Sequence, residues 1–381
     1  LHLTKPAGMV VFISSNKFMR AGYGEKLRRH LTTATTLRAL IDYGDLPLFT
    51  ATAYPCIVAT RAAAPGADAA PQTLVIDTLA DVEKTGEVMQ QRAWPLAQTA
   101  LRPDGWALER PETLALLAKL RKAGKPLREY IGGQLYYGIK TGLNEAFIVD
   151  LETRNRLIAE DESSRTVLKP FLRGRDVKRW KARYADLWVI FLRHGTSINK
   201  YPAIKAHLEQ FKERLQPKPS DWPNTKPWPG RKAGSYKWYE IQDNVAYWEE
   251  FERPKILIPA ITNAPQYAFD DSGMYSNDKT SICIAEHPYY LLGILNSRLM
   301  WWFITQTASA KQGGFFECKP MYVGQIPIPA WQAGEEITPL VQALLVRQAA
   351  GEDVAALEAA IDAAVYRLFG VAEGEVAVVE G

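Results

Sequence analysis

The distribution of tryptophan divides this 381-residue chain into two parts. Nine of its eleven tryptophans lie between residues 126 and 334, in a region of short β-rich segments with many aromatic residues and prolines. The residues before Pro126 follow a different pattern, in which apolar runs of strand length alternate with helical spacing. A chain of this length favours two or three domains of about 150 residues each. We therefore expect a domain boundary close to Pro126.

The first 61 residues predict the order strand, helix, strand, strand. Met9–Ile13 is a continuous apolar run typical of a buried strand, and Glu25–Thr33 carries leucines at helical spacing after Gly22 and Gly24. These two glycines are interpreted as the start of a helix. Further strands are expected at Leu37–Asp42, Tyr54–Thr60 and Leu74–Ile76, and a helix is expected to start at Pro111. Such an order indicates an α/β sheet with a helix-covered face.

The second part predicts shorter strands and a helical end. Strands are expected at Leu135–Ile139 and Ala146–Leu151, which flank a turn at Lys140–Asn144, and at Leu187–Leu192 and Lys255–Ile261. The helices expected are Ala203–Leu215, the apolar Tyr289–Ile304, and two amphipathic helices at Ile337–Ala350 and Val354–Phe369. The proline-rich residues 217–230 predict a long surface loop.

Composition excludes several classes of protein. With 47% hydrophobic and 23% charged residues the chain is not disordered, collagen-like or a coiled coil. The three scattered cysteines predict neither disulfides nor a zinc site, and favour a reducing cytoplasm. No apolar run is long enough for a membrane span, and no export signal is recognisable. Because the chain starts with Leu1 and its first methionine is Met9, we expect it to be a fragment that begins inside a domain.

Charge is distributed unevenly along the chain. Residues 335–381 carry a net charge of −7, whereas residues 1–334 carry +11. Seven lysines and arginines against a single aspartate lie in one stretch, Lys169 to Arg183, whose sequence is KPFLRGRDVKRWKAR. A basic stretch that also contains aromatic residues suits nucleic acid, although a solvated surface segment is the alternative.

Common catalytic signatures are absent from the sequence. It contains no P-loop, no GxSxG, no HExxH and no histidine pair at metal-ligand spacing. The acidic pair at Asp270 and Asp271 lies beside Gly273, which favours a turn over a catalytic dyad. Motifs alone therefore identify no complete active site and no metal site.

Two regions resemble one known family. Leu3–Arg61 resembles the second half of the TaqI-like adenine-N6 DNA methyltransferase domain, in its "lkPgG" strand, "LR..L" helix and following strands. Residues 130–330 resemble the TaqI-like C-terminal specificity domain of single-chain Type IIG restriction-modification enzymes and related phage-defence methyltransferases. The matching segments are Gly138–Phe147, Leu168–Trp180, Arg253–Leu257, Tyr290–Ser297, Gly313–Glu317 with Gln325–Pro329, and the tail Ile361–Gly370.

The resemblance implies a fold and a division into domains. It implies an α/β part followed by an α+β part: the rear of a Rossmann-like methyltransferase sheet, then a mixed, β-rich target recognition domain and a short helical tail. The expected boundaries are 1–80 for the methyltransferase part, 81–125 for a linker with a helix, 126–332 for the recognition domain and 333–381 for the tail. The family's catalytic Asn-Pro-Pro-Tyr/Phe motif and its adenosylmethionine loop precede this region, and neither occurs in the sequence.

The resemblance also implies roles for particular residues. Phe49 matches the aromatic residue that stacks on the flipped adenine, with Tyr54 as a weaker candidate and a core phenylalanine as the alternative. Phosphates and base edges of double-stranded DNA are expected to meet cations and polar groups of the specificity domain. The turn at Lys140-Thr141-Gly142 is one such candidate, although it could be an ordinary hairpin turn. The full set of DNA-binding candidates is Lys140, Thr141, Asn144, Arg173, Arg175, Lys178, Arg179, Lys181, Arg183, Arg231, Lys232 and Lys311, together with Asn224 of the long loop.

The function expected is DNA sequence recognition within a site-specific adenine-N6 DNA methyltransferase of a bacterial or archaeal cytoplasm. The parent enzyme would use S-adenosyl-L-methionine, but residues 1–381 are expected to bind none and to be inactive alone. The expected partners are double-stranded DNA, the missing N-terminal methyltransferase half and possibly a nuclease domain, with no membrane. One alternative is a stand-alone DNA-binding specificity subunit without catalytic activity. Another, suggested by the many tryptophans, is a carbohydrate-binding protein.

Overall fold

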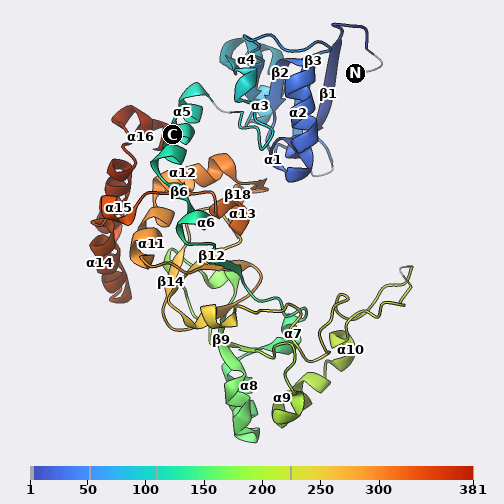
Figure 1. The fold of residues 1–381 in the computed structure, drawn as a ribbon, viewed down its shortest axis with the longest axis vertical. Helices are drawn as coiled ribbons and strands as arrows, with labels where there is room; N and C mark the ends of the chain where they lie inside the picture. The colour runs from blue at the N-terminus through green and yellow to red at the C-terminus, as the bar shows by residue number, and fades with distance from the viewer. Residues whose placement is uncertain (1–3, 51–52, 109, 224, 381) are drawn as a thin grey trace. The chain divides into compact units, whose positions relative to one another are not determined.

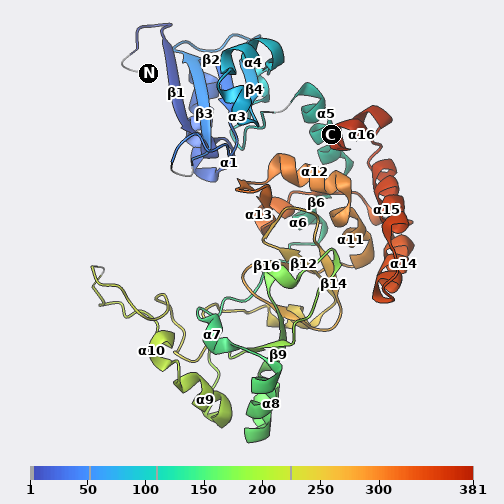
Figure 2. The ribbon, with the colours of Figure 1, turned by 180° about the vertical axis from the view of Figure 1, so that it is seen from behind.

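The computed structural model describes residues 4–50, 53–108, 110–223 and 225–380. They form two compact units, each with its own strands and helices (Figures 1 and 2). Unit 1 comprises the described residues of 1–122, 305–316 and 373–381. Unit 2 comprises the described residues of 123–304 and 317–372. Together these segments give a mixed α/β structure with several separate sheets.

Unit 1 is built on a mixed five-stranded sheet in the order β1-β3-β2-β4-β5. Strand β3 runs antiparallel to both β1 and β2, β4 is parallel to β2, and β5 is antiparallel to β4. The strands are β1 (Met9–Ser15), β2 (Thr36–Asp42), β3 (Pro55–Arg61), β4 (Gln72–Val75) and β5 (Trp94–Pro95). The helices are α1 (Lys17–Arg20), α2 (Glu25–Ala34), α3 (Leu79–Val82), α4 (Thr85–Arg92), α5 (Pro111–Ala123) and α16 (Glu373–Glu380). The predicted strands and the helices at Glu25 and Pro111 are confirmed.

The expectation that Met9–Ile13 forms a buried strand is wrong. β1 is the edge strand of its sheet, and the exposed fractions of Val11, Phe12 and Ile13 are 64%, 66% and 54%. Only β3 pairs with it among the described residues. An apolar run shows that a strand can be covered on both faces, but only the neighbouring elements decide whether it is.

The segment Gly22-Tyr23-Gly24 opens helix α2, as the sequence predicts. It forms one 3₁₀ turn directly before Glu25. A Cβ atom at Gly24 would lie 2.0 Å from the carbonyl oxygen of Phe18, so the close approach of the backbone requires glycine here. The side chain of Arg28, which is buried, donates hydrogen bonds to the carbonyls of Phe18, Ala21 and Pro103 and holds this corner together.

Unit 2 contains two larger sheets that share one core. The first has the order β10-β14-β12-β16-β7 and the second β15-β9-β11-β8. Their strands are β7 (Leu135–Tyr137), β8 (Ile148–Val149), β9 (Leu168–Leu172), β10 (Trp180–Lys181), β11 (Leu187–Ile190), β12 (Lys255–Pro259), β14 (Ala268–Asp270), β15 (Tyr275–Ser276) and β16 (Thr280–Cys283). Short strands elsewhere in unit 2 are β6 (Lys125–Pro126), paired with β19 (Pro327–Ile328), and β13 (Ile261–Thr262). In the segment 305–316 of unit 1, β17 (Ala310–Lys311) pairs with β18 (Phe315–Glu317), which ends at the first residue of the next unit 2 segment.

Helices cover the ends of these sheets. The remaining helices are α6 (Leu127–Tyr130), α7 (Asn144–Phe147), α8 (Leu151–Glu160), α9 (Pro202–Glu209), α10 (Lys212–Leu215), α11 (Pro288–Asn296), α12 (Arg298–Thr307), α13 (Pro320–Val323), α14 (Ile337–Ala349) and α15 (Ala355–Leu368). The two predicted tail helices are confirmed as α14 and α15, which pack with α11 (Figure 1). No helix in the described ranges is long and apolar enough to cross a membrane.

Three local predictions in unit 2 differ from the structure. The segments at 135–139 and 146–151 do not flank a hairpin turn, because β7 joins one sheet, β8 joins the other, and residues 144–147 form α7. The helix predicted at Ala203–Leu215 is interrupted after Glu209, although Ile204, Leu208 and Leu215 are fully buried as expected. Similarly, the predicted apolar helix at Tyr289–Ile304 is divided at Ser297 into α11 and α12.

One ion pair is completely enclosed in unit 2. The ammonium of Lys255, whose exposed fraction is zero, lies 2.5 Å from a carboxylate oxygen of Asp270 and also donates to the carbonyl of Phe251. The same carboxylate accepts hydrogen bonds from the backbone of Ser272 and Met274. Both charges are therefore satisfied within the core.

We predict that Lys255→Met strongly destabilises the protein, because it leaves the buried carboxylate of Asp270 without its cation. The free energy of unfolding in urea should fall by about 3–5 kcal/mol. Lys279→Met is the matched control, since Lys279 pairs with Asp278 at the surface, and it should change the value by less than about 0.5 kcal/mol. Equal effects of the two substitutions would contradict this assignment.

Candidate nucleic-acid interface

Three loops of unit 2 meet around Asn277, through its side chain and through the backbone of residues 276–278. Its Oδ1 atom accepts the backbone N–H groups of Gly174 and of Lys279, each at 3.2 Å. Its own N–H donates to the carbonyl of Leu172, and its backbone bridges Ile139. Asn277 is only 8% exposed. We call residues 138–142, 172–176 and 277–279 the loop cluster; two of its three loops are those that the sequence singled out separately as candidate DNA contacts.

Close backbone approach holds the loop cluster together. A Cβ atom at Gly138 would lie 1.9 Å from the carbonyl oxygen of Asn277, and one at Gly174 would lie 2.7 Å from the carbonyl oxygen of Lys279. The N–H of Asp278 donates to the carbonyl of Ile139 at 3.0 Å. Glycine at both positions therefore allows the three loops to pack backbone against backbone.

Arg173 fixes the shape of its own loop. Its guanidinium makes two hydrogen bonds to the carboxylate of Asp176, at 2.8 and 2.9 Å, and its backbone N–H donates to the same carboxylate. Burial alone would raise the pKa of Asp176, but the hydrogen bonds from Arg173 lower it overall. Arg173 is therefore occupied within the turn, and its neighbour Arg175 is exposed.

Buried contacts of Thr141 and Gly142 fix the turn at Lys140-Thr141-Gly142. Thr141 is buried and its hydroxyl donates to Oδ1 of the exposed Asn144 at 2.7 Å. Gly142 has a φ of +84°, and a Cβ atom there would lie 2.6 Å from the side chain of Arg231. Glycine is thus required by the packing of Arg231. Lys140 is half-buried, which leaves it as the cation that this turn offers.

Arg231 is a buried structural residue, which contradicts its prediction as a DNA-binding residue. It is 3% exposed, and all five of its N–H groups donate to backbone carbonyls. The acceptors, at 2.7–3.1 Å, are the carbonyls of Thr141, Leu215, Lys237, Trp238 and Glu240. Burial lowers its pKa to about 10. No donor remains for a base or phosphate.

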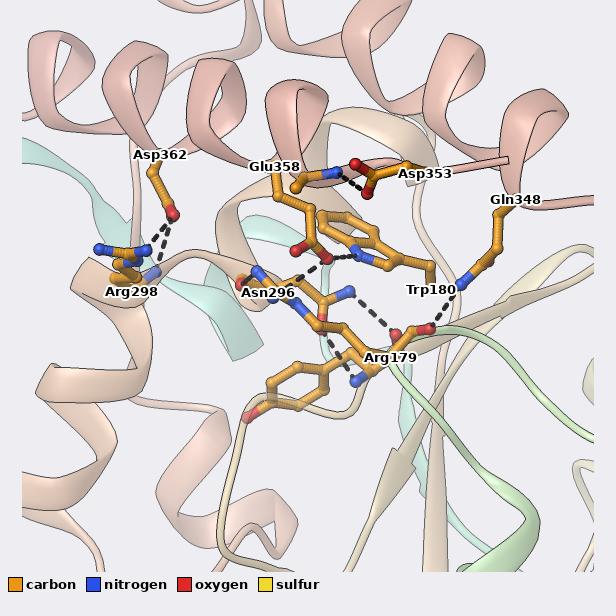
Figure 3. Close-up of polar contacts among 10 residues, drawn as sticks. Arg179, Trp180, Asn296, Arg298, Gln348, Asp353, Glu358 and Asp362 are labelled. Carbon is orange, nitrogen blue, oxygen red and sulfur yellow. Dashed lines mark hydrogen bonds and ion pairs between the residues drawn. The ribbon is translucent and has the colours of Figure 1, made fainter. Parts of the chain in front are cut away.

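Arg179 and the adjacent Trp180 are engaged by the tail helix α15. Figure 3 shows both side chains directed toward Glu358: the carboxylate lies 3.0 Å from Nη1 of Arg179 and accepts the indole N–H of Trp180. Arg179 also donates to the carbonyl of Asn296 at 2.9 Å. The side chain of Asn296 in turn bonds both backbone groups of Tyr267. Asn296 is therefore a satisfied packing residue, and Arg179 has internal partners.

A second contact in the same region involves α15. The carboxylate of Asp362 accepts the backbone N–H of Arg298 at 2.9 Å and pairs with its guanidinium at 3.3 Å (Figure 3). Burial raises the pKa of Asp362. Helix α15 is therefore held to the rest of unit 2 by two acidic residues, Glu358 and Asp362.

The other predicted cations differ in exposure. Three of them, Lys181, Arg183 and Lys232, are exposed. The other two, Lys178 and Lys311, are half-buried. Asn224 lies outside the described residues. Lys279, which the sequence analysis missed, is exposed and belongs to the loop cluster. The sequence feature that could have identified Lys279 is the polar tripeptide Asn277-Asp278-Lys279, which lies between two β-rich segments.

Phe49 lies at the surface of unit 1. It is 52% exposed, which excludes the alternative that it is a core residue. It lines a shallow pocket with Tyr54, Asp45, Leu46, Thr50 and Gln312. The ammonium of Lys17 lies 4.7 Å from the ring centre of Tyr54. The structure thus brings the two aromatic candidates to one pocket.

Comparisons with known proteins agree with this organisation. Residues 169–328 match the TaqI-like C-terminal specificity domain, and residues 1–49 match the Eco57I restriction-modification methylase. Residues 169–328 are therefore similar to the TaqI-like C-terminal specificity domain, and the chain as a whole is similar to Type II restriction-modification methyltransferases. The resemblance expected from the sequence is confirmed.

The similarity to individual relatives covers nearly the whole chain. The Type II methyltransferase M.PaeR7I of Pseudomonas aeruginosa is 25% identical over 97% of this chain and 62% of its own length. M.XhoI of Xanthomonas vasicola is 22% identical over 98% of this chain and 67% of its own length. The Type IIL restriction-modification enzyme MmeI, solved in complex with DNA, has the same fold over 97% of this chain and 48% of its own, with a TM-score of 0.60 at 14% identity. The chain thus spans about two thirds of the length of these curated relatives.

We predict that Asn277→Ala loosens the loop cluster, because the N–H groups of Gly174 and Lys279 lose their acceptor. The free energy of unfolding in urea should fall by about 1–2 kcal/mol. Asn277→Asp keeps the acceptor oxygen and should lose less. If the alanine variant is as stable as the parent, the amide does not hold the loops.

Proposed function

We propose that the chain is the DNA-recognition part of a site-specific adenine-N6 DNA methyltransferase. The observation that carries this proposal is the loop cluster, in which the loops that carry Lys140, Arg175 and Lys279 are joined around one buried asparagine. Cations on closely packed backbone loops suit contact with phosphates, which position a protein on DNA. MmeI, of the same fold, was solved with DNA, and that relationship supports the proposal.

The proposal assigns a role to each part of the chain. Residues 1–80 would be the rear part of a Rossmann-like methyltransferase sheet, 81–125 a linker, 126–332 the target recognition domain and 333–381 a helical tail. The exposed apolar edge strand β1 supports the first assignment, because further strands of such a sheet could pair with it. The same edge disfavours a stand-alone DNA-binding subunit. The cellular location proposed is the cytoplasm of a bacterium or archaeon, in agreement with three buried free cysteines.

We propose that the described residues do not hold S-adenosyl-L-methionine by themselves. In the glycine pair before α2, Gly24 is packed against the backbone of Phe18 and leaves no space for a ligand there, whereas Gly22 has no atom within 4 Å of a Cβ position. The sequence also lacks an Asn-Pro-Pro-Tyr/Phe motif. We therefore infer that cofactor binding and methyl transfer use residues outside this sequence, and that residues 1–381 alone are inactive. Whether a nuclease is part of the same enzyme is independent of this assignment.

A carbohydrate-binding function is less well supported. Trp180 is 1% exposed, and its indole N–H is bonded to Glu358. Trp222 and Trp228 contact each other edge to face. Tryptophans engaged in this way serve the fold, whereas sugar-binding tryptophans present an open ring face.

We predict that the double substitution Arg175→Ala and Lys279→Ala weakens binding to duplex DNA. If both cations touch phosphates, the slope of log affinity against log salt should become shallower by about 1.8 units, because each neutralised phosphate contributes about 0.9. Titrations of labelled duplex at several salt concentrations measure this slope. Arg156→Ala with Lys200→Ala removes the same charge from other exposed positions and should change the slope by much less. An unchanged slope in the first pair would refute phosphate binding by the loop cluster.

A second prediction concerns Phe49 in the intact methyltransferase. Phe49→Ala should lower the methylation rate by at least about tenfold, because stacking on a base contributes about 1–3 kcal/mol, while DNA affinity changes little. Tyr54→Ala, from the same pocket, is the comparison and should have a smaller effect. Equal reductions in methylation and in DNA affinity would argue against stacking on a flipped base.

A further inference from the structure

The described proline-rich residues 217–223 and 225–230, which we call the projecting loop, extend away from the sheets and helices of unit 2. Figures 1 and 2 show this segment as a narrow excursion beyond α10. Its two ends are closed by a short stem, in which the N–H of Lys218 donates to the carbonyl of Arg231 at 3.0 Å and the N–H of Arg231 donates to the carbonyl of Gln216 at 2.9 Å. The two ends of the loop are therefore held next to each other at this stem.

Internal contacts order the projecting loop. Trp222 and Trp228 meet edge to face with ring centres 4.7 Å apart. The indole N–H of Trp222 donates to the carbonyl of Lys226, and that of Trp228 donates to the carbonyl of Gln216. The segment also contains five prolines, which restrict the backbone. Such a loop is preorganised, so little conformational entropy is given up when a partner binds it.

Arg231 connects the base of the projecting loop to the loop cluster. Its guanidinium donates to the carbonyl of Thr141 at 2.8 Å, and its side chain packs against Gly142. The position of the projecting loop is thus tied to the turn that carries Lys140. Both elements belong to unit 2.

The surface charge of this region is positive. Lys226 and Lys232 are exposed and Lys218 is half-buried, whereas Asp221 is the one acidic residue between positions 217 and 232. An ordered, protruding segment of this charge is complementary to a phosphate backbone.

We propose that the projecting loop is a second DNA-contacting element, which places Lys218, Lys226 and Lys232 on the phosphates of a duplex bound at the loop cluster. This inference rests on the proposed function. The tryptophans support the loop from within, and Arg231 is a positioning residue that sets its place relative to Lys140.

The test is the triple substitution of Lys218, Lys226 and Lys232 by alanine in the full 381-residue chain. Its affinity for a random-sequence duplex at low salt should fall at least about tenfold, and the salt slope should become shallower by about two to three units. Unchanged affinity and slope would overturn the proposal. So would a weaker affinity accompanied by a lower midpoint of urea unfolding, because it would report misfolding.

The matched control removes three cations elsewhere, by alanine at Lys84, Lys122 and Lys125, which are all exposed. Its affinity should stay within about twofold of the parent, and an equal reduction in control and test would mean that net charge alone is responsible. The variant with Arg175 and Lys279 replaced separates the two proposals. If that variant binds weakly and the loop variant binds normally, the loop proposal alone fails; if both bind normally, the proposed function fails too.

A single substitution tests whether the order of the loop matters. Trp222→Ala keeps every charge but removes the packing against Trp228, so it should weaken DNA binding several-fold with an unchanged salt slope. Full affinity in this variant would overturn the inference that the loop acts as a preorganised element.

Discussion

The amide oxygen of Asn277 accepts the backbone N–H groups of Gly174 and Lys279, which lie in different loops, while the neighbouring backbone groups of Ser276 and Asp278 bond Ile139 of a third loop. These segments come from positions more than a hundred residues apart in the sequence, such as Gly174 and Asn277. An amide buried at 8% exposure can hold them because each hydrogen bond also satisfies a backbone group that would otherwise lie unpaired at a crowded junction. The surface that we assign to DNA depends on this junction, because Lys140, Arg175 and Lys279 occupy its three loops.

The basic residues of unit 2 fall into two groups with different physical roles. Arg173, Arg179 and Arg231 use their forked guanidinium groups for internal hydrogen bonds, to a carboxylate, to the tail helix and to five carbonyls. The exposed cations stand on the segments that these arginines fix. Arginine suits the internal role because its planar group satisfies several acceptors at once. A substitution in the first group should therefore act on DNA binding through structure, whereas one in the second should act through charge.

The sequence predicted local features well and long-range ones poorly. The helix after Gly24, the strands of unit 1 and the two tail helices follow from apolar spacing, which is a local property. The hairpin at Lys140 was wrong because β7 and β8 join different sheets, which no local pattern reports. Composition identified the basic stretch from Lys169 to Arg183. The sequence could not, however, separate Arg231, which is bonded to a carbonyl 90 residues away, from an exposed cation. Asn277 escaped notice because nothing in its own segment reveals the two loops that it joins.

The most direct test of the account is a selection from a randomised duplex pool by the 381-residue chain, with the bound DNA sequenced at two salt concentrations. The account predicts enrichment of one short motif that contains an adenine, with binding that weakens as salt rises. Failure to retain any duplex, even at low salt, would contradict the central claim that unit 2 recognises DNA.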